Sequence, residues 1–368
     1  MAKRRIKEAT TAVKRGRVPV PEGVKEENVV LDLKSDVKSE FGSVSEIEVK
    51  IEPHSISCEV KPEATPQNLQ QHKQVPDIEE LPNIFMRASN EDMDSAAKFP
   101  PRWVDIYNEV VEMRAKITAP VDLMGCERIP DGMTPKLSVN DPRTFRFQLL
   151  ISLMLSSQTK DEVLDDAMRK LNNGLKSRGF QQGLSLESVM TLSDKELDGY
   201  IGKVGFHNRK TVYIKNACIM LQEQFGGDIP NTIEQIVKLP GVGPKMGYLL
   251  LQRGWNISTG IGVDVHLHRL AMMWGWSKKT TNPDMTRKYL EEWLPRKFWA
   301  EINPLLVGFG QVICTPQFQN CDVCSLATKS LCKSVNRKLV NKGLTEERLE
   351  KLKKGRGDLA QLLVSMGT

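Results

Sequence analysis

The chain of 368 residues contains few aromatic side chains and no long uninterrupted hydrophobic run. Phenylalanine, tryptophan and tyrosine together make up 6% of it, and hydrophobic residues make up 40%. A helix that crosses a membrane needs about 20 consecutive apolar residues, so the sequence predicts a protein that does not enter the membrane. The hydrophobic fraction is nevertheless sufficient for one or two packed cores.

Cysteine is also sparse, with seven residues, and no secretion signal precedes them. We therefore expect a reducing compartment, where clustered thiols bind metal rather than form disulfides. Cys314, Cys321, Cys324 and Cys332 follow the pattern C-x6-C-x2-C-x7-C. Four thiolates suit a structural zinc ion or an iron–sulfur cluster. Zinc sites more often show two CxxC pairs, so the single pair here favours a [4Fe–4S] cluster.

The net charge of +6 hides a strong asymmetry along the chain. Residues 1–17 carry a net charge of +6, residues 18–98 a net charge of −9, and the remainder a net charge of +9. The first 98 residues are poor in aromatics and rich in Glu, Lys, Ser and Pro, which predicts a disordered leader. The basic remainder suits a polyanionic partner such as DNA.

The segment Leu239-Pro-Gly-Val-Gly-Pro-Lys245 has the features of a helix–hairpin–helix. Gly241 and Gly243 allow a tight turn in which backbone amides converge. Amides at the start of the following helix can bind a DNA phosphate. We therefore expect Leu239, Gly241, Val242 and Gly243 to contact DNA.

Lys245 falls in the first turn of the second hairpin helix, and Asp264 follows nineteen positions later in Val-Asp-Val-His. The positive end of a helix dipole disfavours the ammonium form of a lysine and favours the nucleophilic amine. The simpler interpretation is that Lys245 only neutralises a phosphate. Asp264 favours the nucleophile but does not decide between the two.

Six collinear elements resemble the endonuclease III family of base-excision DNA glycosylases in its eukaryotic form. The resemblance covers roughly Trp103 to Lys333. Its elements are the segment 149–161 (LLISLMLSSQTKD), Val204-Gly-Phe206, the hairpin 239–245, Val263-Asp264, Val307-Gly-Phe-Gly-Gln311 and the cysteine loop.

The resemblance implies a bifunctional glycosylase and AP lyase that acts on oxidised pyrimidines or abasic sites in double-stranded DNA. Lys245 would form the Schiff base, Asp264 would be its acidic partner, and the four cysteines would hold a [4Fe–4S] cluster. Gln158 would fill the gap left by a flipped base, and Phe206 would be the opposing wedge. His266 could contact a phosphate, whereas a solvated or capping histidine is the alternative.

Two features depart from the family pattern. Val265 stands where many relatives have threonine, which alters the hydrogen bonding available beside the acid. The last cysteine spacing is seven residues rather than five. Two extra residues are easily accommodated in a surface loop, so both assignments stand.

The expected fold is all-α with two helical lobes. A six-helix barrel with the helix–hairpin–helix would span 139–258, and a cluster lobe would combine 99–138 with 259–335. Helical patterns recur near 103–117, 143–156, 161–174, 194–202, 208–225, 232–238, 244–253, 264–274, 284–293 and 296–312. Residues 336–368 are expected to form a C-terminal helical extension, exposed or loosely docked. We expect a monomer.

Three other functions fit parts of the sequence. A monofunctional adenine-type glycosylase shares the hairpin, the acid and the cluster but ordinarily lacks the lysine found at position 245. A non-catalytic helix–hairpin–helix DNA-binding protein needs neither Asp264 nor a cluster. A redox protein built around the cluster would need a site for an electron partner, which nothing else in the sequence indicates.

The basic N-terminus, with Lys3-Arg4-Arg5, predicts a nuclear localisation signal or a nonspecific DNA-binding arm. A mitochondrial presequence is the alternative. We expect the nucleus and leave the mitochondrion open as a second location.

The leader also repeats an apolar-Lys-x-Glu pattern, which resembles the acceptor site of the small ubiquitin-like modifier. The pattern centres on Lys25, Lys38, Lys50 and Lys61, at spacings of thirteen, twelve and eleven residues. We predict that at least one of these lysines is modified. An assay for conjugates on the wild-type chain tests this, and their absence would remove the hypothesis.

Overall fold

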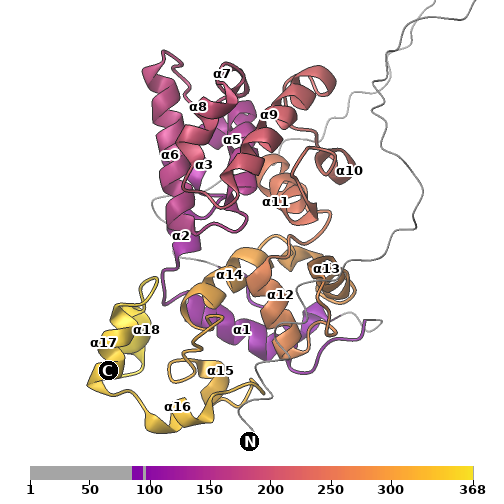
Figure 1. Ribbon diagram of the computed structural model, residues 1–368. Helices are drawn as coiled ribbons and strands as arrows, with labels where there is room; N and C mark the ends of the chain where they lie inside the picture. The colour runs from indigo at the N-terminus through magenta and orange to yellow at the C-terminus, as the bar shows by residue number, and fades with distance from the viewer. Residues whose placement is uncertain (1–84, 94–96, 368) are drawn as a thin grey trace, which may run out of the picture. The chain divides into compact units, whose positions relative to one another are not determined.

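The computed structural model describes residues 85–93 and 97–367, and within them the secondary structure is helical (Figure 1). Extended pairing in this part of the chain is limited to two isolated antiparallel bridges, Thr118–Asp358 and Cys314–Gln319. The helices are η1 Asn90–Asp92, α1 Trp103–Arg114, α2 Pro120–Met124, α3 Ile129–Met133, α4 Leu137–Asn140, α5 Pro142–Ser156, α6 Asp161–Ser177, α7 Leu186–Met190, α8 Asp194–Ile201, α9 His207–Gln224, α10 Ile233–Ile236, α11 Pro244–Trp255, α12 Val265–Trp274, α13 Pro283–Glu291, η2 Arg296–Phe298, α14 Ile302–Val312, α15 Ser325–Thr328, α16 Arg337–Lys342, α17 Glu346–Lys353 and α18 Ala360–Ser365.

The expected all-α fold is confirmed, and most of the long helices begin and end within a few residues of the predicted limits. The predicted helix 296–312 is wrong as one element, because η2 ends at Phe298 and α14 starts afresh at Ile302. Pro304 explains the break: it has no N–H to bond to a carbonyl four residues earlier, and it is tolerated only in the first turn of a helix. No helix of the described residues is long and apolar enough to cross a membrane.

The end of the expected disordered leader, residues 1–98, is ordered against the rest of the protein. Residues 85–93 pack against α1, where Ala88 is buried and its N–H donates to Asn108 Oδ1 at 2.8 Å. Lys25, Lys38, Lys50 and Lys61, proposed as modification sites, lie outside the described residues.

A first hydrophobic core combines α1, α12–α15, α17 and α18. Arg114, at the end of α1, is fully buried in it. Its guanidinium donates to both carboxylate oxygens of Asp122, at 3.1 and 2.6 Å, and to the carbonyl of Leu305 at 3.2 Å. A Cβ at position 308 would lie 2.4 Å from Arg114 Cζ. Gly308 therefore makes room for the buried arginine that joins α1, α2 and α14.

A second core is built around α5, in which every residue from 144 to 155 is buried. Helices that are covered on all sides belong to the interior of a domain. This core takes its side chains from residues 129–251, in the helices α3 to α11 and the loops between them. Ile129 and Leu137, assigned from the sequence to the cluster lobe, therefore pack with the barrel, and the boundary between the two lobes falls about ten residues earlier than expected.

The C-terminal extension is docked rather than loose. Leu352, Leu359, Leu362 and Leu363 are buried in the first core. Arg348 of α17 adds a polar anchor, because its guanidinium donates to both carboxylate oxygens of buried Asp322, at 2.6 and 3.0 Å. The extension is helical as expected, and it forms three short helices, α16, α17 and α18.

We predict that Leu362→Ala lowers the free energy of unfolding by about 2–3 kcal/mol, because truncating a buried leucine leaves a cavity. Val364, two residues away, is 72% exposed, so Val364→Ala should change it by about 0.5 kcal/mol or less. Urea unfolding of the full chain, with the slope compared between variants, measures both. Equal effects of the two substitutions would contradict the docked arrangement of α18.

Candidate active site

The predicted hairpin connects α10 to α11 by a tight turn. Gly241 has a φ of +78°, and a Cβ there would lie 2.6 Å from the Tyr213 ring, so only glycine fits. The side chains of Leu239 and Val242 are buried in the second core. Both therefore anchor the turn, and the groups that the turn leaves for DNA are backbone amides. Gly241 is exposed and Gly243 is half-buried.

Lys245 lies in the first turn of α11, after Gly243 as N-cap and Pro244 as the first residue. Its side chain is half-buried. The unpaired amides of this turn and the positive end of the helix dipole form an anion site. The lysine is thus next to the position where a DNA phosphate would bind.

Gly262 allows the segment that leads to Asp264 to pack against α11, the helix that carries Lys245. A Cβ at position 262 would lie 2.7 Å from Leu249 Cδ2 and 3.3 Å from the carbonyl oxygen of Lys245. The backbone at 262 therefore lies directly against the first turns of α11. Asn303 of α14 holds it there, donating from Nδ2 to the Gly262 carbonyl at 2.6 Å. Lys245 belongs to a helix of the second core and Asp264 to the start of a helix of the first core, and this contact joins the two helices.

Asp264 is the N-cap of α12 and is 9% exposed. Its Oδ1 accepts a hydrogen bond from the Leu267 amide at 2.8 Å. Its other oxygen accepts none from the residues that the structure describes. The carboxylate is therefore fixed by one oxygen, while the second remains available to a substrate or a water molecule.

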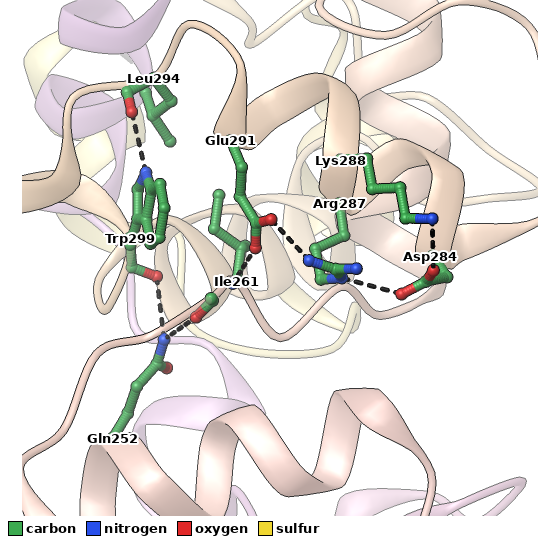
Figure 2. A network of polar contacts seen from close by, with 9 residues as sticks. Gln252, Ile261, Asp284, Arg287, Lys288, Glu291, Leu294 and Trp299 are labelled. Carbon is green, nitrogen blue, oxygen red and sulfur yellow. Dashed lines mark hydrogen bonds and ion pairs between the residues drawn. The ribbon is translucent and has the colours of Figure 1, made fainter. Parts of the chain in front are cut away.

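A network of polar contacts holds the segment before Asp264 between α11 and α13 (Figure 2). Gln252 of α11 donates from Nε2 to the Gly260 carbonyl at 2.7 Å. Glu291 of α13 accepts from the Ile261 amide at 2.9 Å, and Arg287 donates to its other oxygen at 2.5 Å. These contacts fix the backbone that connects the two cores.

Four ionisable groups surround Lys245 closely enough for its charge to act on them. Burial raises the pKa of Cys126 to about 12 and raises the pKa values of Glu127 and Asp161, while the Lys245 charge lowers all three. Burial lowers the pKa of His266, and the Lys245 charge lowers it further. Lys245 therefore has ionisable neighbours in both lobes, such as Asp161 of α6 and His266 of α12.

The Val307–Gln311 motif contacts two of these four groups, His266 and Asp161. A Cβ at Gly310 would lie 2.6 Å from His266 Nδ1, so the imidazole rests on α14 at a position where a side chain would collide. Gln311 Nε2 donates to Asp161 Oδ2 at 2.6 Å, and its Oε1 accepts from the Val121 amide at 3.0 Å. Because the pKa of His266 is lowered, the imidazole is neutral near pH 7 and offers a hydrogen bond rather than a positive charge.

Gln158 and Phe206, predicted to act on either side of a flipped base, lie on adjoining loops. A Cβ at Gly205 would lie 2.4 Å from the Gln158 carbonyl, and the Gly205 amide donates to Thr159 Oγ1 at 3.2 Å. Gln158 and Phe206 both have left-handed backbones, with φ of 56° and 59°, and both are exposed. Such conformations cluster at functional sites.

Lys210 was missed in the sequence. Its side chain is buried, and Nζ donates to the carbonyls of Leu155 at 2.8 Å and Ser157 at 2.6 Å. Burial lowers the pKa of Lys210 to about 8. It caps the C-terminus of α5 and so supports the loop that carries Gln158. No local pattern marked it, because Lys210 stands between Arg209 and Thr211 at the polar start of α9.

The four predicted cysteines line one pocket of the first core, together with Trp274 and Phe309. Three of the sulfurs accept hydrogen bonds: Cys332 from the Ser334 amide, Cys321 from the Asn336 amide and Cys314 from Arg269, at 3.4, 3.5 and 3.6 Å. Donors of this kind stabilise the negative charge of cluster-bound sulfur. Within the described residues, no three His, Cys, Asp or Glu side chains are arranged to hold a single metal ion.

Comparisons with known proteins identify the family of the chain. A family model described as the HhH-GPD superfamily of base excision DNA repair proteins matches residues 151–296. The endonuclease III homolog of Schizosaccharomyces pombe is 45% identical over 255 residues, which are 69% of this chain and 68% of that protein. Endonuclease III-like protein 1 of Gallus gallus is 43% identical over 239 residues, which are 65% of this chain and 79% of that protein.

Among solved structures, a trapped endonuclease III–DNA covalent intermediate is 24% identical to this chain with a TM-score of 0.46. The match covers 58% of this chain and 95% of that one. The family assignment depends instead on the sequence relatives, which align over about two thirds or more of both chains. By that measure the chain belongs to the endonuclease III family of base-excision DNA repair enzymes, which are DNA glycosylases with an associated AP lyase activity.

Proposed function

We propose that this protein acts as a monomer on oxidised pyrimidines and abasic sites in duplex DNA, through an imine formed by Lys245. The observation that carries the proposal is the contact at Gly262, which places the backbone of Lys245 against the segment that leads into Asp264. A lysine that only neutralised a phosphate would not need a buried carboxylate, Asp264, at the end of a segment packed against its own helix.

Binding would begin at the hairpin. The hairpin turn suits a DNA phosphate, because the first amides of α11 have no partner within the helix and lie at its positive end. The target base must then leave the stack, which costs a few kcal/mol and least where the base is damaged. Gln158 and Phe206 support this step, since both are exposed on adjoining loops and could fill the space that the base leaves.

Lys245 would then attack C1′ of the flipped nucleoside. The bond from C1′ to the base breaks, its electrons leave with the base, and the base takes up a proton. Asp264 would stabilise the positive charge that develops on the sugar and accept a proton from Lys245, directly or through water. Its oxygen without a hydrogen bond supports this role.

The lone pair of the lysine nitrogen then opens the sugar ring: the C1′–O4′ bond breaks, and O4′ takes up a proton. The resulting iminium joins Lys245 to C1′ of the open-chain sugar and makes the C2′ proton acidic. Removal of that proton forms a double bond between C2′ and C3′ and expels the 3′ phosphate, which cuts the strand on the 3′ side of the lesion. Water then hydrolyses the imine and regenerates the lysine. The same nucleophile would therefore serve both the glycosylase and the lyase step.

Cys314, Cys321, Cys324 and Cys332 would hold a [4Fe–4S] cluster with a structural role. The sulfur-directed hydrogen bonds and the apolar lining of the pocket fit this group. Burial raises the pKa of Cys324 to about 12, so the thiols must lose protons when iron binds. The cluster would shape a basic loop, including Lys329 and Lys333, that contacts DNA.

The family and the basic N-terminus support a nuclear location for the enzyme, with the mitochondrion as a second location. The modification of the leader at Lys25, Lys38, Lys50 or Lys61 remains part of this proposal.

We predict that Lys245→Gln abolishes covalent trapping by borohydride on duplex DNA with one thymine glycol, because glutamine cannot form an imine. Wild-type protein should yield the adduct, and gel electrophoresis separates it from free DNA. If the glutamine variant still cut the strand, Lys245 would not be the lyase nucleophile. A wild-type protein that gave no adduct even on an abasic site would be a monofunctional glycosylase of the adenine type or a non-catalytic DNA binder.

Asp264→Asn provides a matched second variant. Asparagine is as good an N-cap as aspartate, so the bond from the Leu267 amide and the start of α12 are kept while the charge is removed. We expect base release to slow by about 10²–10⁴-fold, the range for a general acid–base group, with unchanged unfolding. Release at the wild-type rate would exclude a catalytic charge at position 264.

We predict that the purified chain contains four iron and four sulfide ions, the composition of a [4Fe–4S] cluster, and that Cys332→Ser lowers both. Cys218 is fully buried in the second core, away from the pocket, so Cys218→Ala should leave both contents unchanged. Metal analysis and acid-labile sulfide measure them. One zinc ion without sulfide would contradict the cluster.

A further inference from the structure

The loop between α17 and α18 is fixed against the first core. The Asp358 amide donates to the Thr118 carbonyl at 2.7 Å, and the Thr118 amide donates back to the Asp358 carbonyl at 3.0 Å. Gly357 has a φ of +76°, and a Cβ there would lie 2.4 Å from the Thr118 carbonyl oxygen. The loop is thus closely fitted to its support, and the preceding residue, Arg356, projects from a defined backbone.

Arg356 extends from this loop to the other core. Its Nη2 donates to both carboxylate oxygens of Glu162, at 2.9 and 3.2 Å, in the first turn of α6. The two side chains are 43% and 48% exposed. Exposed ion pairs contribute little to stability, so the pair is easily exchanged for another anion that binds the guanidinium better.

Arg356 shares its surroundings with the catalytic lysine. The positive charges of Arg356 and Lys245 both act on Asp161 and on His266. The geometry agrees, because the partner of Arg356, Glu162, adjoins Asp161 at the start of α6, and Gln311 bonds Asp161 from α14. Arg356 therefore lies beside the groups around Lys245, although it comes from a segment outside the residues 151–296 that the family model matches.

The substrate brings phosphates to this space. A nucleotide whose C1′ is attacked by Lys245 carries a phosphate on either side of its sugar, so at least one must pass the groups that surround the lysine. A guanidinium binds phosphate with two parallel hydrogen bonds and remains charged at any physiological pH. An arginine that is half exposed and paired only with a surface carboxylate is suited to this contact.

We propose that Arg356 binds a phosphate of the damaged strand beside the flipped nucleotide, and that it leaves Glu162 to do so. The C-terminal extension is then part of the DNA-binding surface, and Glu162 occupies the guanidinium until DNA arrives. The proposal rests on the function proposed above, because it takes Lys245 as the point around which the strand is placed.

The test is the salt dependence of binding to a duplex that contains a tetrahydrofuran analogue of an abasic site. This analogue offers no leaving group at C1′, so the measurement does not depend on imine chemistry. For the full-length, cluster-containing protein, the plot of log K against log salt should become less steep by about 0.9 in Arg356→Gln, the slope for one phosphate contact. Arg356→Lys should keep most of the wild-type slope.

Arg178→Gln is the matched control. Arg178 donates to Glu196 at 2.8 Å in a similarly exposed pair, with side-chain exposures of 38% and 41%. It lies past the opposite end of α6, about 24 Å from Glu162 at 1.5 Å per residue. Its loss should leave the slope unchanged. An unchanged slope in Arg356→Gln as well would overturn the proposal.

Glu162→Gln distinguishes phosphate binding by Arg356 from a purely structural role of the Arg356–Glu162 ion pair, which would act as a strap between the two cores. If Glu162 competes with DNA for the guanidinium, its neutralisation should tighten binding. If the ion pair mattered only as a strap, Glu162→Gln would weaken binding as Arg356→Gln does, and the proposal would fail. Failure of borohydride trapping at Lys245 would leave these binding measurements intact, so the two proposals can fail separately.

Discussion

The close contact of the backbone at Gly262 with α11 is the constraint on which the candidate site depends. Lys245 belongs to a helix of the second core, whereas Asp264 starts a helix of the first. Any side chain at position 262 would collide with Leu249 and separate the two. Asn303, Gln252 and the Glu291 network then fix the direction of the segment. The candidate site is therefore assembled by the junction of two cores rather than by either core alone.

The sequence was sufficient for those parts of the site whose evidence is local. Periodicity predicted the long helices, and the hairpin identified Lys245 by its place in the first turn. The contacts of Gly262, Gln252 and Glu291 were not predictable, because they depend on segments brought together from separate cores. Burial was also hidden: Leu239 and Val242 stand in a turn that reads as exposed, yet both side chains anchor it from the inside.

The two ends of the described chain show the same difficulty in another form. The sequence indicated a helical extension at residues 336–368, but a local pattern does not say which surface it packs against. The receiving surface combines α1, α14 and the cysteine segment. Ala88 was likewise unremarkable in a polar leader, although Asn108 bonds both its amide and its carbonyl, at 2.8 Å each. Such docking depends on shapes that exist only after the core has formed.

The carboxyl groups around Lys245 are in unlike environments, and this difference has a chemical purpose. A polyanionic strand must approach a site that holds Asp161, Glu127 and Asp264. Burial raises the pKa values of Asp161 and Glu127, which reduces the negative charge that they present to the strand at a given pH. Asp264 instead is the N-cap of α12, where its Oδ1 accepts a hydrogen bond from the Leu267 amide. In the proposed chemistry Asp264 would supply the charge that assists Lys245, while Asp161 and Glu127 surround the lysine with less repulsion of DNA.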